Sequence, residues 1–513
     1  MERKDGYITD IEYVHGVYRE LGPSALNLVL LIQSLEPIAL QEGFTYCDLG
    51  CGQGGSVNLF AACHPEGAFH GIDFNSVHIE GARGLARQAD LDNVTFWEAS
   101  FADLDGLDLP AFDFVVMHGI YTWVGAENRR HILEFLGKKL KPGGAVFLSY
   151  NSLPGWSPHA PLRQLLSSYA ETLSGPLEQR VEEAIEFVGR LKTAQASIFA
   201  GNPSTGEFFD YICTLPRNYL AHEFFNSHWT LFYHADVVRD LAAVGLSFAG
   251  SANLAENQDM LRFSAAQQQL VDSVPDRVMR ETLKDFVVSP LLRRDVFTRE
   301  RRKIGPGRQM EHFYRRRFAV VVPPAKLERK ALFPVGEVLF EAELYDPILS
   351  ALELKPHTLE ELLQREELAA LGLARVTEAL MVLLSAQYVM PSVEPTLRSV
   401  MATEKLNAML LERQQNDLSQ QSLASPVLQS AIKVEWLERL LIICELNRTL
   451  DPLWFVWEQM KAQQHKLTRD GETLQTEAEN IAQLVLEIKS FRRCKLPLLR
   501  QLGVLPSAGT SPV

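Results

Sequence analysis

The chain has 513 residues, of which 46% are hydrophobic and 22% charged, so its composition is that of an ordinary globular protein with a sizeable core. At about 150 residues per domain, this length predicts two to four domains. The formal net charge of −14 gives no overall attraction to nucleic acid or to an anionic membrane surface, although a local basic patch is compatible with it. We therefore expect no nucleic-acid partner.

Six cysteines are spread along the chain without the paired spacing of a zinc site, so we expect no bound metal. Sparse cysteines are typical of a reducing cytoplasm. No apolar stretch follows the charged residues Glu2–Asp5, so we expect no signal peptide. Apolar runs such as Leu28–Ile32 are far too short to cross a membrane. These features predict a cytoplasmic protein without membrane insertion.

Residues 1–43 are predicted to form a helical cap, because an apolar stripe at helical spacing begins near Leu26. Two roles fit such a helix: covering the mouth of a ligand site, or packing on the edge of a domain. The apolar stripe comprises Leu26, Val29, Leu30 and Leu35, and the rings that precede it are Tyr7, Tyr13, His15 and Tyr18.

A strand that contains Asp48 then ends in closely spaced glycines, and a helix-like run follows. Glycine permits left-handed dihedrals and a close approach of backbone to ligand, and a helix N-terminus offers free N–H groups. Asp48 lies two residues before the first glycine, where its carboxylate can hold a cationic ammonium group. Gly50, Gly52 and Gly54 fit an acid-x-G-x-G-x-G pattern, whereas Gly50, Gly52 and Gly55 fit the dinucleotide fingerprint, a weak match alone.

Further strands alternate with helical segments up to about residue 150, which predicts a parallel sheet with right-handed crossovers. The ligand of such a sheet lies at the carboxyl ends of the strands. The strand 68–72 ends at Asp73, which is 73 − 50 = 23 residues after Gly50 and suits ribose hydroxyls. The other strands are expected at 94–98, at 112–117 and after 140–144. The groups expected around one pocket are the Gly50 loop, Asp73, Ser100–Phe101 and His118.

Three of these motifs together resemble class I S-adenosylmethionine-dependent methyltransferases: Asp48 to Gly54, Gly71-Ile72-Asp73, and Leu140 to Gly144. The resemblance implies an α/β fold with a Rossmann-like sheet, and S-adenosyl-L-methionine as the cofactor. Many members carry an acid for the adenine amino group where Ser100 stands, and a serine hydroxyl can still accept a hydrogen bond. The neighbouring Phe101 can pack on the adenine face. The cofactor-binding residues implied are Asp48, Gly50, Gly52, Gly54, Asp73, Phe74, Ser100, Phe101 and His118.

Two loops, 118–124 and 149–156, follow the fourth and fifth strands and form the expected wall of the acceptor site. Their aromatic rings attract a sulfonium or a methylated ammonium by roughly 0.5–2 kcal/mol each; simple burial of the rings is the alternative. The Asn/Asp-Pro-Pro-aromatic signature is absent after the fourth strand, which argues against a nucleobase acceptor. The candidates for orienting or deprotonating the acceptor are His118, Tyr121, Trp123 and Tyr150.

Residues 157–225 interrupt the sheet with helices predicted over 161–173 and 177–200, which we interpret as a lid or a substrate-selecting insertion. Helix and strand resume afterwards, so the catalytic domain is predicted to span 44–255. Residues 256–321 are predicted to form a helical regulatory or connector region. Its arginine-rich runs fit a solvated or interdomain face better than the docking of an acidic substrate.

Pro323 and Pro324 mark a predicted linker. The pattern over 325–394 predicts a winged-helix-like module. Its third helix carries only Arg375 and Glu378 as charges, whereas a DNA-recognition helix needs cations for phosphate contacts. We therefore predict a structural or protein-docking module. Residues 395–513 are predicted to form a helical C-terminal domain.

A closer resemblance is to bacterial methyltransferases that carry a methyltransferase regulatory domain, a group that includes rickettsial protein-lysine methyltransferases of outer-membrane proteins. It covers about residues 10–300 and implies N-methylation of lysine in a protein substrate. The Tyr- and Pro-rich N-terminal segment of that group has no clear counterpart here. The stretches that carry the resemblance are His118–Val124, Ser149–Trp156, Asn218–Glu223, Ala249–Asn257 and Arg294–Phe297.

Three functions stay open on the sequence. The first is a protein methyltransferase that acts on lysine. The second is a small-molecule methyltransferase whose helical C-terminal half serves as a lid or in dimerisation. The third is an S-adenosylmethionine-responsive binding protein with a helical effector domain. The oligomeric state also stays open, and a dimer is compatible with the sequence.

Overall fold

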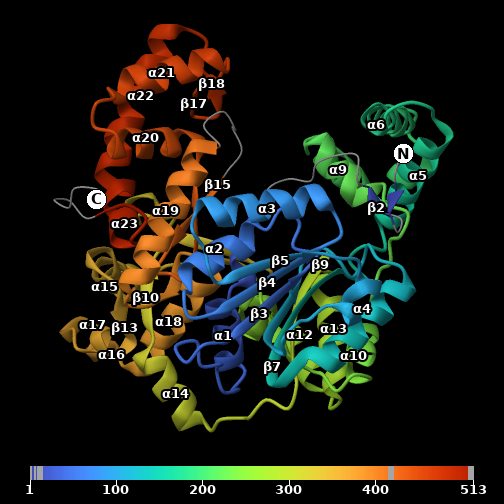
Figure 1. Ribbon diagram of the computed structural model, residues 1–513, viewed down its shortest axis with the longest axis horizontal. Coiled ribbons are helices and arrows are strands. Elements are labelled where there is room, and N and C mark those ends of the chain that lie inside the picture. Colours follow the sequence, from blue (N-terminus) through green and yellow to red (C-terminus); the bar gives the residue numbers. More distant parts are fainter. Residues whose placement is uncertain (1–2, 5–6, 9–15, 414–420, 507–513) are drawn as a thin grey trace.

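The computed structural model describes residues 3–4, 7–8, 16–413 and 421–506. Its centre is a seven-stranded sheet with helices on both faces, which confirms the predicted α/β class (Figure 1). The strands run parallel except for β9, which is antiparallel to both of its neighbours. In spatial order they are β5 (Val94–Glu98), β4 (Ala68–Asp73), β3 (Thr45–Leu49), β6 (Phe112–Met117), β7 (Leu140–Asn151), β9 (Leu292–Thr298) and β8 (Ser247–Ser251).

Strand β9 lies in a segment that the sequence assigned to a helical connector. It pairs with β7 from Ala145 to Asn151 and with β8 on its other side. The sheet therefore extends to Thr298, beyond residue 255, where the sequence placed the end of the catalytic domain. The sequence did not predict this strand because the charged residues Arg293 and Asp295 suggest a solvated surface. In the structure both are buried and form an ion pair with each other.

Helices cover the two faces of the sheet, so its central strands are apolar on both sides. Phe114 and Phe147 pack in the core beneath α1, α2 and α3, whereas Val115 and Val146 pack in the core beneath α4 and α10. Helix α13 packs on α10. These helices are α1 (Pro23–Ile32), α2 (Gly55–Cys63), α3 (Ser76–Gln88), α4 (Ala126–Lys139), α10 (His234–Ala242) and α13 (Arg277–Val288).

Helix α2 is buried along its whole length from Ser56 to Cys63. The sheet lies on one side of it, and α19 (Leu397–Arg413) lies on the other with the hairpin of β15 (Gln421–Ser425) and β16 (Ser430–Val434). Residues from the end of the chain thus complete the core that begins at the glycine turn.

The insertion between β7 and α10 is a helical unit with its own apolar core around Trp156. The ring centroid of Trp156 lies 5.2 Å from that of Trp229 and 5.5 Å from that of Phe208. Helices occupy the two predicted ranges, with a break near Gln195, whose φ is 56°. The helices are α5 (Ala160–Thr172), α6 (Leu177–Thr193), α7 (Ser197–Ala200), α8 (Pro203–Cys213) and α9 (Arg217–Phe224).

The next module has a three-stranded sheet in the order β13–β10–β14, with helices packed against it. Its strand β10 precedes Pro323 and Pro324, so the predicted linker lies inside the module. The helix predicted as the third of this module is α18, the fourth in the structure, and it buries Val376, Leu380 and Leu383. The elements are β10 (Arg317–Val320), α15 (Ala342–Leu354), β13 (His357–Thr358), α16 (Leu359–Leu363), α17 (Glu366–Leu371), α18 (Leu373–Ser385) and β14 (Val389–Ser392).

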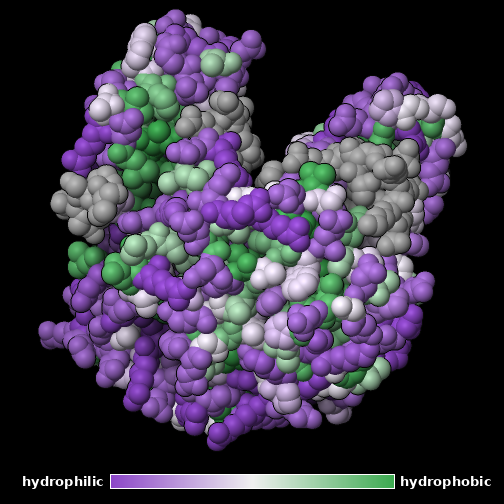
Figure 2. Space-filling view, viewed as in Figure 1, coloured by the Kyte–Doolittle hydropathy of each residue, from purple (hydrophilic) through white to green (hydrophobic). Residues whose placement is uncertain are grey.

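The last helices form a lobe that projects in the same direction as the insertion but at the opposite side of the molecule, and Figure 2 shows a hollow between these two lobes. Within the ranges that the structure describes, no helix is long and apolar enough to cross a membrane. The lobe contains α20 (Trp436–Leu446), α21 (Pro452–Ala462), β17 (Thr468–Arg469), β18 (Glu472–Thr473), α22 (Glu477–Ser490), the π-helix Phe491–Lys495 and α23 (Leu496–Gln501).

The remaining short elements lie before or between these parts. They are β1 (Arg3–Lys4), β2 (Tyr7–Ile8), α11 (Asp259–Arg262), α12 (Ala265–Asp272), α14 (Pro306–Arg315), β11 (Lys330–Phe333), β12 (Gly336–Leu339) and the 3-10 helices η1 (Arg19–Leu21), η2 (Phe101–Gly106), η3 (Leu254–Asn257) and η4 (Pro324–Lys326).

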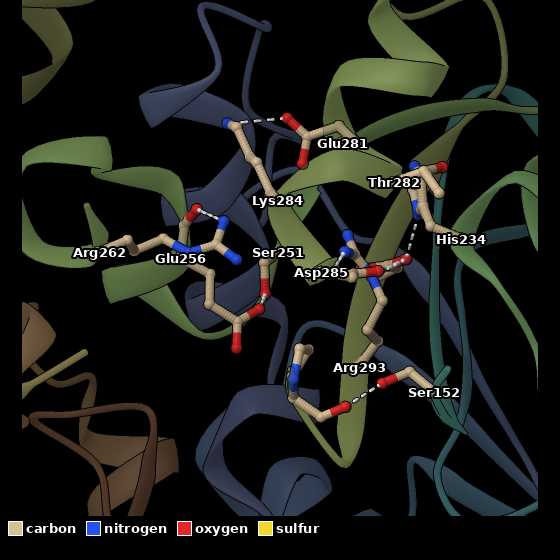
Figure 3. Close-up of polar contacts among 12 residues, drawn as sticks. Ser152, His234, Ser251, Glu256, Arg262, Glu281, Thr282, Lys284, Asp285 and Arg293 are labelled. Carbon is tan, nitrogen blue, oxygen red and sulfur yellow. Dashed lines mark hydrogen bonds and ion pairs between the residues drawn. The ribbon is translucent and has the colours of Figure 1, made fainter. Parts of the chain in front are cut away.

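A buried charge network ties β9 to α13, α10 and β7, and Figure 3 shows part of it. The Arg293 guanidinium donates to Asp285 Oδ1 at 2.6 Å and to Asp295 Oδ2 at 3.0 Å. His234 Nδ1 lies 3.1 Å from Asp295 Oδ2. Burial raises the pKa of Asp285 to about 6, against the opposing charge of Arg293. Burial also opposes ionisation of Asp295, but Arg293 outweighs it and the pKa of Asp295 falls below its usual value.

Replacing Arg293 tests whether this network holds the edge of the sheet together. We expect Arg293→Met to lower the free energy of unfolding by about 3–5 kcal/mol, because it leaves two buried carboxylates without their cation. Urea denaturation followed by circular dichroism measures this change. The matched control is Arg308→Met, which removes a half-exposed partner of Glu36 and should cost at most about 1 kcal/mol. Equal losses in the two variants would contradict the role of the network.

Candidate active site

The glycine turn connects the end of β3 to the start of α2. The backbone N–H groups of Gly50 and Cys51 both donate to the carbonyl of Ile72, at 2.7 and 3.0 Å, which holds the turn against β4. Gly50, Gly52 and Gly54 have φ angles of 78°, 53° and 69°, a region that strongly favours glycine. The backbone conformation of the turn therefore explains why glycine stands at these three positions.

The space around each glycine shows whether close packing or room for a ligand favours glycine at that position. A Cβ atom on Gly50 would lie 2.2 Å from Ile120 Cδ1, and one on Gly54 would lie 2.6 Å from Ala82 Cβ. A Cβ atom on Gly52 would meet nothing within 4 Å among the described atoms. The turn is thus closely packed at both ends and open at its middle, where a ligand can approach the backbone.

Asp48 lies beneath the turn and is 5% exposed. Burial, and after it the charge of Asp73, raises the pKa of Asp48 to about 7. Among the residues that the structure describes, none forms a hydrogen bond or an ion pair with this carboxylate. A buried carboxylate of this kind is stabilised by a cation, which fits the predicted ammonium-binding role.

Asp73 ends β4 on the other side of the turn. Its carboxylate accepts hydrogen bonds from the backbone N–H groups of Gly52 and Asn75, each at 2.9 Å. These contacts fix the carboxylate next to the open middle of the turn. Phe74, which follows it, is half-buried.

In the segment after β5, the structure shows an interaction of Ser100 that the sequence analysis did not predict. Ser100 Oγ donates to Asp103 Oδ2 at 2.6 Å, so the hydroxyl hydrogen is committed, while its lone pairs stay able to accept a hydrogen bond. Asp103 is an exposed carboxylate in the same turn, and sequence reasoning missed it. The signal was an acid three residues after Ser100, in the pattern of a capping box. Phe101 is half-buried and packs against the core beneath α4 and α10.

His118 lies at the end of β6, and its ring centroid is 4.0 Å from that of Tyr18. Its Nδ1 atom is buried and has no hydrogen-bond partner among the described residues. Burial lowers the pKa of His118 to about 4, Glu20 opposes the shift, and Arg294 adds to it. The imidazole is therefore neutral at pH 7. It is therefore a weak base, and its buried Nδ1 atom is better suited to orienting an acceptor by a hydrogen bond than to deprotonating it.

The structure places two of the other three catalytic candidates, Tyr121 and Tyr150, away from His118. Tyr121 is fully buried, and its hydroxyl donates to Asp240 Oδ2 on α10 at 3.0 Å. Tyr150 is fully buried, and its hydroxyl donates to Asp295 Oδ2 at 2.7 Å. Trp123 is 5% exposed. The two tyrosines belong to the core beneath α10, opposite the face on which His118 meets Tyr18, so burial is the better interpretation of these rings.

Three residues that the sequence did not assign surround His118 instead. The segment before α1 crosses the glycine turn, and the backbone N–H of Tyr18 donates to Ser56 Oγ at 3.3 Å. Glu20 Oε1 lies 3.6 Å from Arg294 Nε on β9. We call Tyr18, Glu20, His118 and Arg294 the acceptor cluster. Of the other rings noted before α1, Tyr13 and His15 lie outside the described residues, and Tyr7 is described only in its backbone.

Comparison with known proteins agrees with this architecture. A family model described as "Methyltransferase domain" matches residues 40–195, and one described as "Predicted methyltransferase regulatory domain" matches residues 216–299. The second match contains β8 and β9, so it supplies an edge of the sheet, whereas the sequence placed the regulatory region at 256–321. Fold and site together define an S-adenosylmethionine-dependent methyltransferase of class I.

Full-length relatives define the group more closely. The "Uncharacterized protein sll1526" of Synechocystis sp. is 37% identical over 506 residues, which cover 98% of this chain and 100% of that protein. The chain therefore belongs to the sll1526 family of methyltransferases with a regulatory domain. The "Uncharacterized protein RP028" of Rickettsia prowazekii is 32% identical over 165 residues, 32% of this chain and 65% of that one.

A solved structure shares the whole fold. PKMT2 from Rickettsia typhi, solved in complex with AdoHcy, superposes with a TM-score of 0.68 at 20% sequence identity, over 96% of this chain and 99% of that one. The likeness extends the fold to the C-terminal modules, which neither family model covers.

The residues present fit the cofactor that this class uses. The open middle of the glycine turn admits a ligand, the buried Asp48 carboxylate suits its ammonium group, and the anchored Asp73 carboxylate suits ribose hydroxyls. When bound, S-adenosyl-L-methionine supplies an electrophilic methyl group on a sulfonium. The protein's part is to hold this group in line with an acceptor.

The raised pKa of Asp48 predicts a pH dependence of cofactor affinity. Its carboxyl group must lose its proton to attract an ammonium, and in the free protein it keeps the proton up to a pKa of about 7. Lowering the pH from about 7.5 to about 6.0 should therefore weaken binding roughly eightfold, the ratio of the ionised fractions. Isothermal titration calorimetry with S-adenosylmethionine measures this. Asp48→Asn should bind more weakly at the higher pH and lose the dependence; an unchanged dependence would contradict the assignment.

Proposed function

We propose that this enzyme N-methylates lysine side chains of a protein substrate. The observation that carries the proposal is the acceptor cluster, in which the Glu20 carboxylate and two rings lie together next to the open glycine turn. A carboxylate beside aromatic rings suits an ammonium group on a flexible aliphatic chain. The resemblance to rickettsial protein-lysine methyltransferases supports the same acceptor. A cytoplasmic location is part of the proposal, supported by the free cysteines.

The residues have distinct roles in this proposal. Glu20 attracts the lysine ammonium and draws it toward His118. The Tyr18 ring covers the site and excludes water, which lowers the lysine pKa from its reference value of about 10.4 and favours transfer of the ammonium proton to the Glu20 carboxylate, so that the neutral amine is the nucleophile. The neutral His118 Nδ1 then orients the amine by a hydrogen bond. With the nucleophile aligned, methyl transfer requires mainly proximity and the correct angle.

Methyl labelling tests the proposal directly. Purified enzyme receives S-adenosylmethionine labelled in its methyl group, together with a lysate of its source organism in which proteins are either native or acetylated on their lysines. We expect label on protein bands of the native lysate and loss of that label in the acetylated one. Asp73→Ala is the cofactor control, because it removes a charged hydrogen-bond partner worth about 1.5–3 kcal/mol of cofactor binding. Label that persists after acetylation would refute lysine as the acceptor, and label confined to small molecules would refute a protein substrate.

Glu20→Gln tests the acceptor cluster. The amide keeps the shape of the side chain but loses the charge that attracts an ammonium, so we expect kcat/KM for the acceptor to fall roughly tenfold to a hundredfold, which corresponds to about 1.4–2.8 kcal/mol. Cofactor affinity, measured by calorimetry, should stay unchanged. The matched control is Glu36→Gln, which weakens a half-buried ion pair with Arg308 that is not part of the cluster and should leave kcat/KM for the acceptor unchanged. Equal effects of the two substitutions would remove Glu20 from the site.

A further inference from the structure

A cavity of about 100 Å³ lies where the catalytic domain meets the C-terminal modules. Its walls come from the segment that begins α1, the loop after β8, strand β14, and the turn between β15 and β16. Neither the glycine turn nor Asp48 nor Asp73 lines it, so it is distinct from the cofactor site. Its apolar wall includes Leu28, Leu254, Leu384, Val389 and Met390.

The charged side chains that line this cavity are Arg19, Arg294 and Glu20, which gives it a net positive charge. Two of the three also belong to the acceptor cluster. The Glu20–Arg294 pair thus lines the cavity and also acts electrostatically on His118.

The guanidinium groups in the cavity have poor acceptors. Arg294 Nε is buried without a hydrogen-bond partner among the described residues, and its nearest anionic atom, Glu20 Oε1, is 3.6 Å away. Arg19 donates to Met390 Sδ at 3.3 Å and to Gln387 Oε1 at 2.9 Å. A thioether is a weak acceptor, and burial lowers the pKa of Arg19. Partly buried guanidinium groups with such partners are stabilised by an anion.

We propose that this cavity binds a small carboxylate with a short alkyl chain. The carboxylate would accept hydrogen bonds from Arg294 and Arg19, and the alkyl chain would lie against the leucines and Val389. Size limits the ligand, because a cavity of about 150 Å³ holds benzene. A cavity of about 100 Å³ therefore suits roughly five non-hydrogen atoms, the size of propionate.

Occupancy of the cavity acts on the acceptor cluster. A carboxylate bound to Arg294 competes with Glu20 for the same guanidinium and leaves Glu20 free to attract the acceptor ammonium beside His118. The ligand would then lower the KM for the acceptor with little change in kcat. This effect on rate rests on the proposed function, whereas binding to the cavity does not.

Binding is tested on the full-length protein saturated with S-adenosylhomocysteine, so that the cofactor site is filled. Saturation-transfer NMR titrations use sodium propionate, with propionamide at the same ionic strength as the uncharged probe of the same shape. We expect saturable binding of propionate and at least roughly tenfold weaker binding of propionamide, because a charge-assisted hydrogen bond contributes about 1.5 kcal/mol or more. Equal binding of the two probes, or no saturable binding of propionate, would overturn the proposal.

Two variants locate the site. Ala25→Leu fills the cavity without changing its charge, and Arg19→Met removes one cation. Each variant should weaken propionate binding at least tenfold. The affinity of each variant for S-adenosylhomocysteine should be unchanged, which shows that it is folded. Arg308→Met on the exposed surface is the matched control and should bind propionate normally. Undiminished binding by Ala25→Leu would place the ligand elsewhere and refute the site. In the methyl-transfer assay, an acceptor KM that propionate leaves unchanged would refute the effect on rate and leave the binding site standing.

Discussion

Helix α1 is buried on two sides, and the geometry of the active site depends on it. Leu26, Val29 and Leu30 pack into the core beneath the sheet, whereas Leu28 and Leu31 pack into the core of the C-terminal modules. At about 2 kcal/mol for each buried leucine or valine, these five side chains contribute roughly 10 kcal/mol, divided between two units of the chain. Helix α1 cannot shift without opening one of the two cores. The residues immediately before it, which include Tyr18 and Glu20, are therefore held over the ends of the strands, and the C-terminal modules help to fix the acceptor cluster.

The sequence was sufficient to predict the parts of the site that depend on local structure. A strand, three glycines and a helix are consecutive in the chain, and their conformation follows from the positive φ angles that the turn requires. Asp48 and Asp73 each lie near the carboxyl end of a strand of a parallel sheet, so topology alone brings them together. The same argument predicted the place of His118, and the class of cofactor followed from these motifs.

The remaining assignments depended on packing that a single sequence does not contain. A tyrosine at the end of a strand faces one side of the sheet or the other, and Tyr150 faces the buried Asp295 rather than His118. Glu20 and Arg294 are far apart in sequence and meet only because β9 is inserted between β7 and β8. Strand β9 itself was not predicted, because buried ion pairs and solvated surfaces use the same charged residue types. Local patterns thus predict the cofactor side of the pocket, and tertiary structure determines the acceptor side.

The burial of α2 from every side has a consequence for the order in which the protein matures. This helix starts at the glycine turn, and its outer surface is covered by α19 and the β15–β16 hairpin, which lie near the end of the chain. While a ribosome is still translating residue 390, the Rossmann-like sheet has already emerged, but the apolar back of α2 faces water. The nascent catalytic domain must therefore wait for residues 397–413 and 421–434 before the outer surface of α2, and with it the cofactor turn, has its final support.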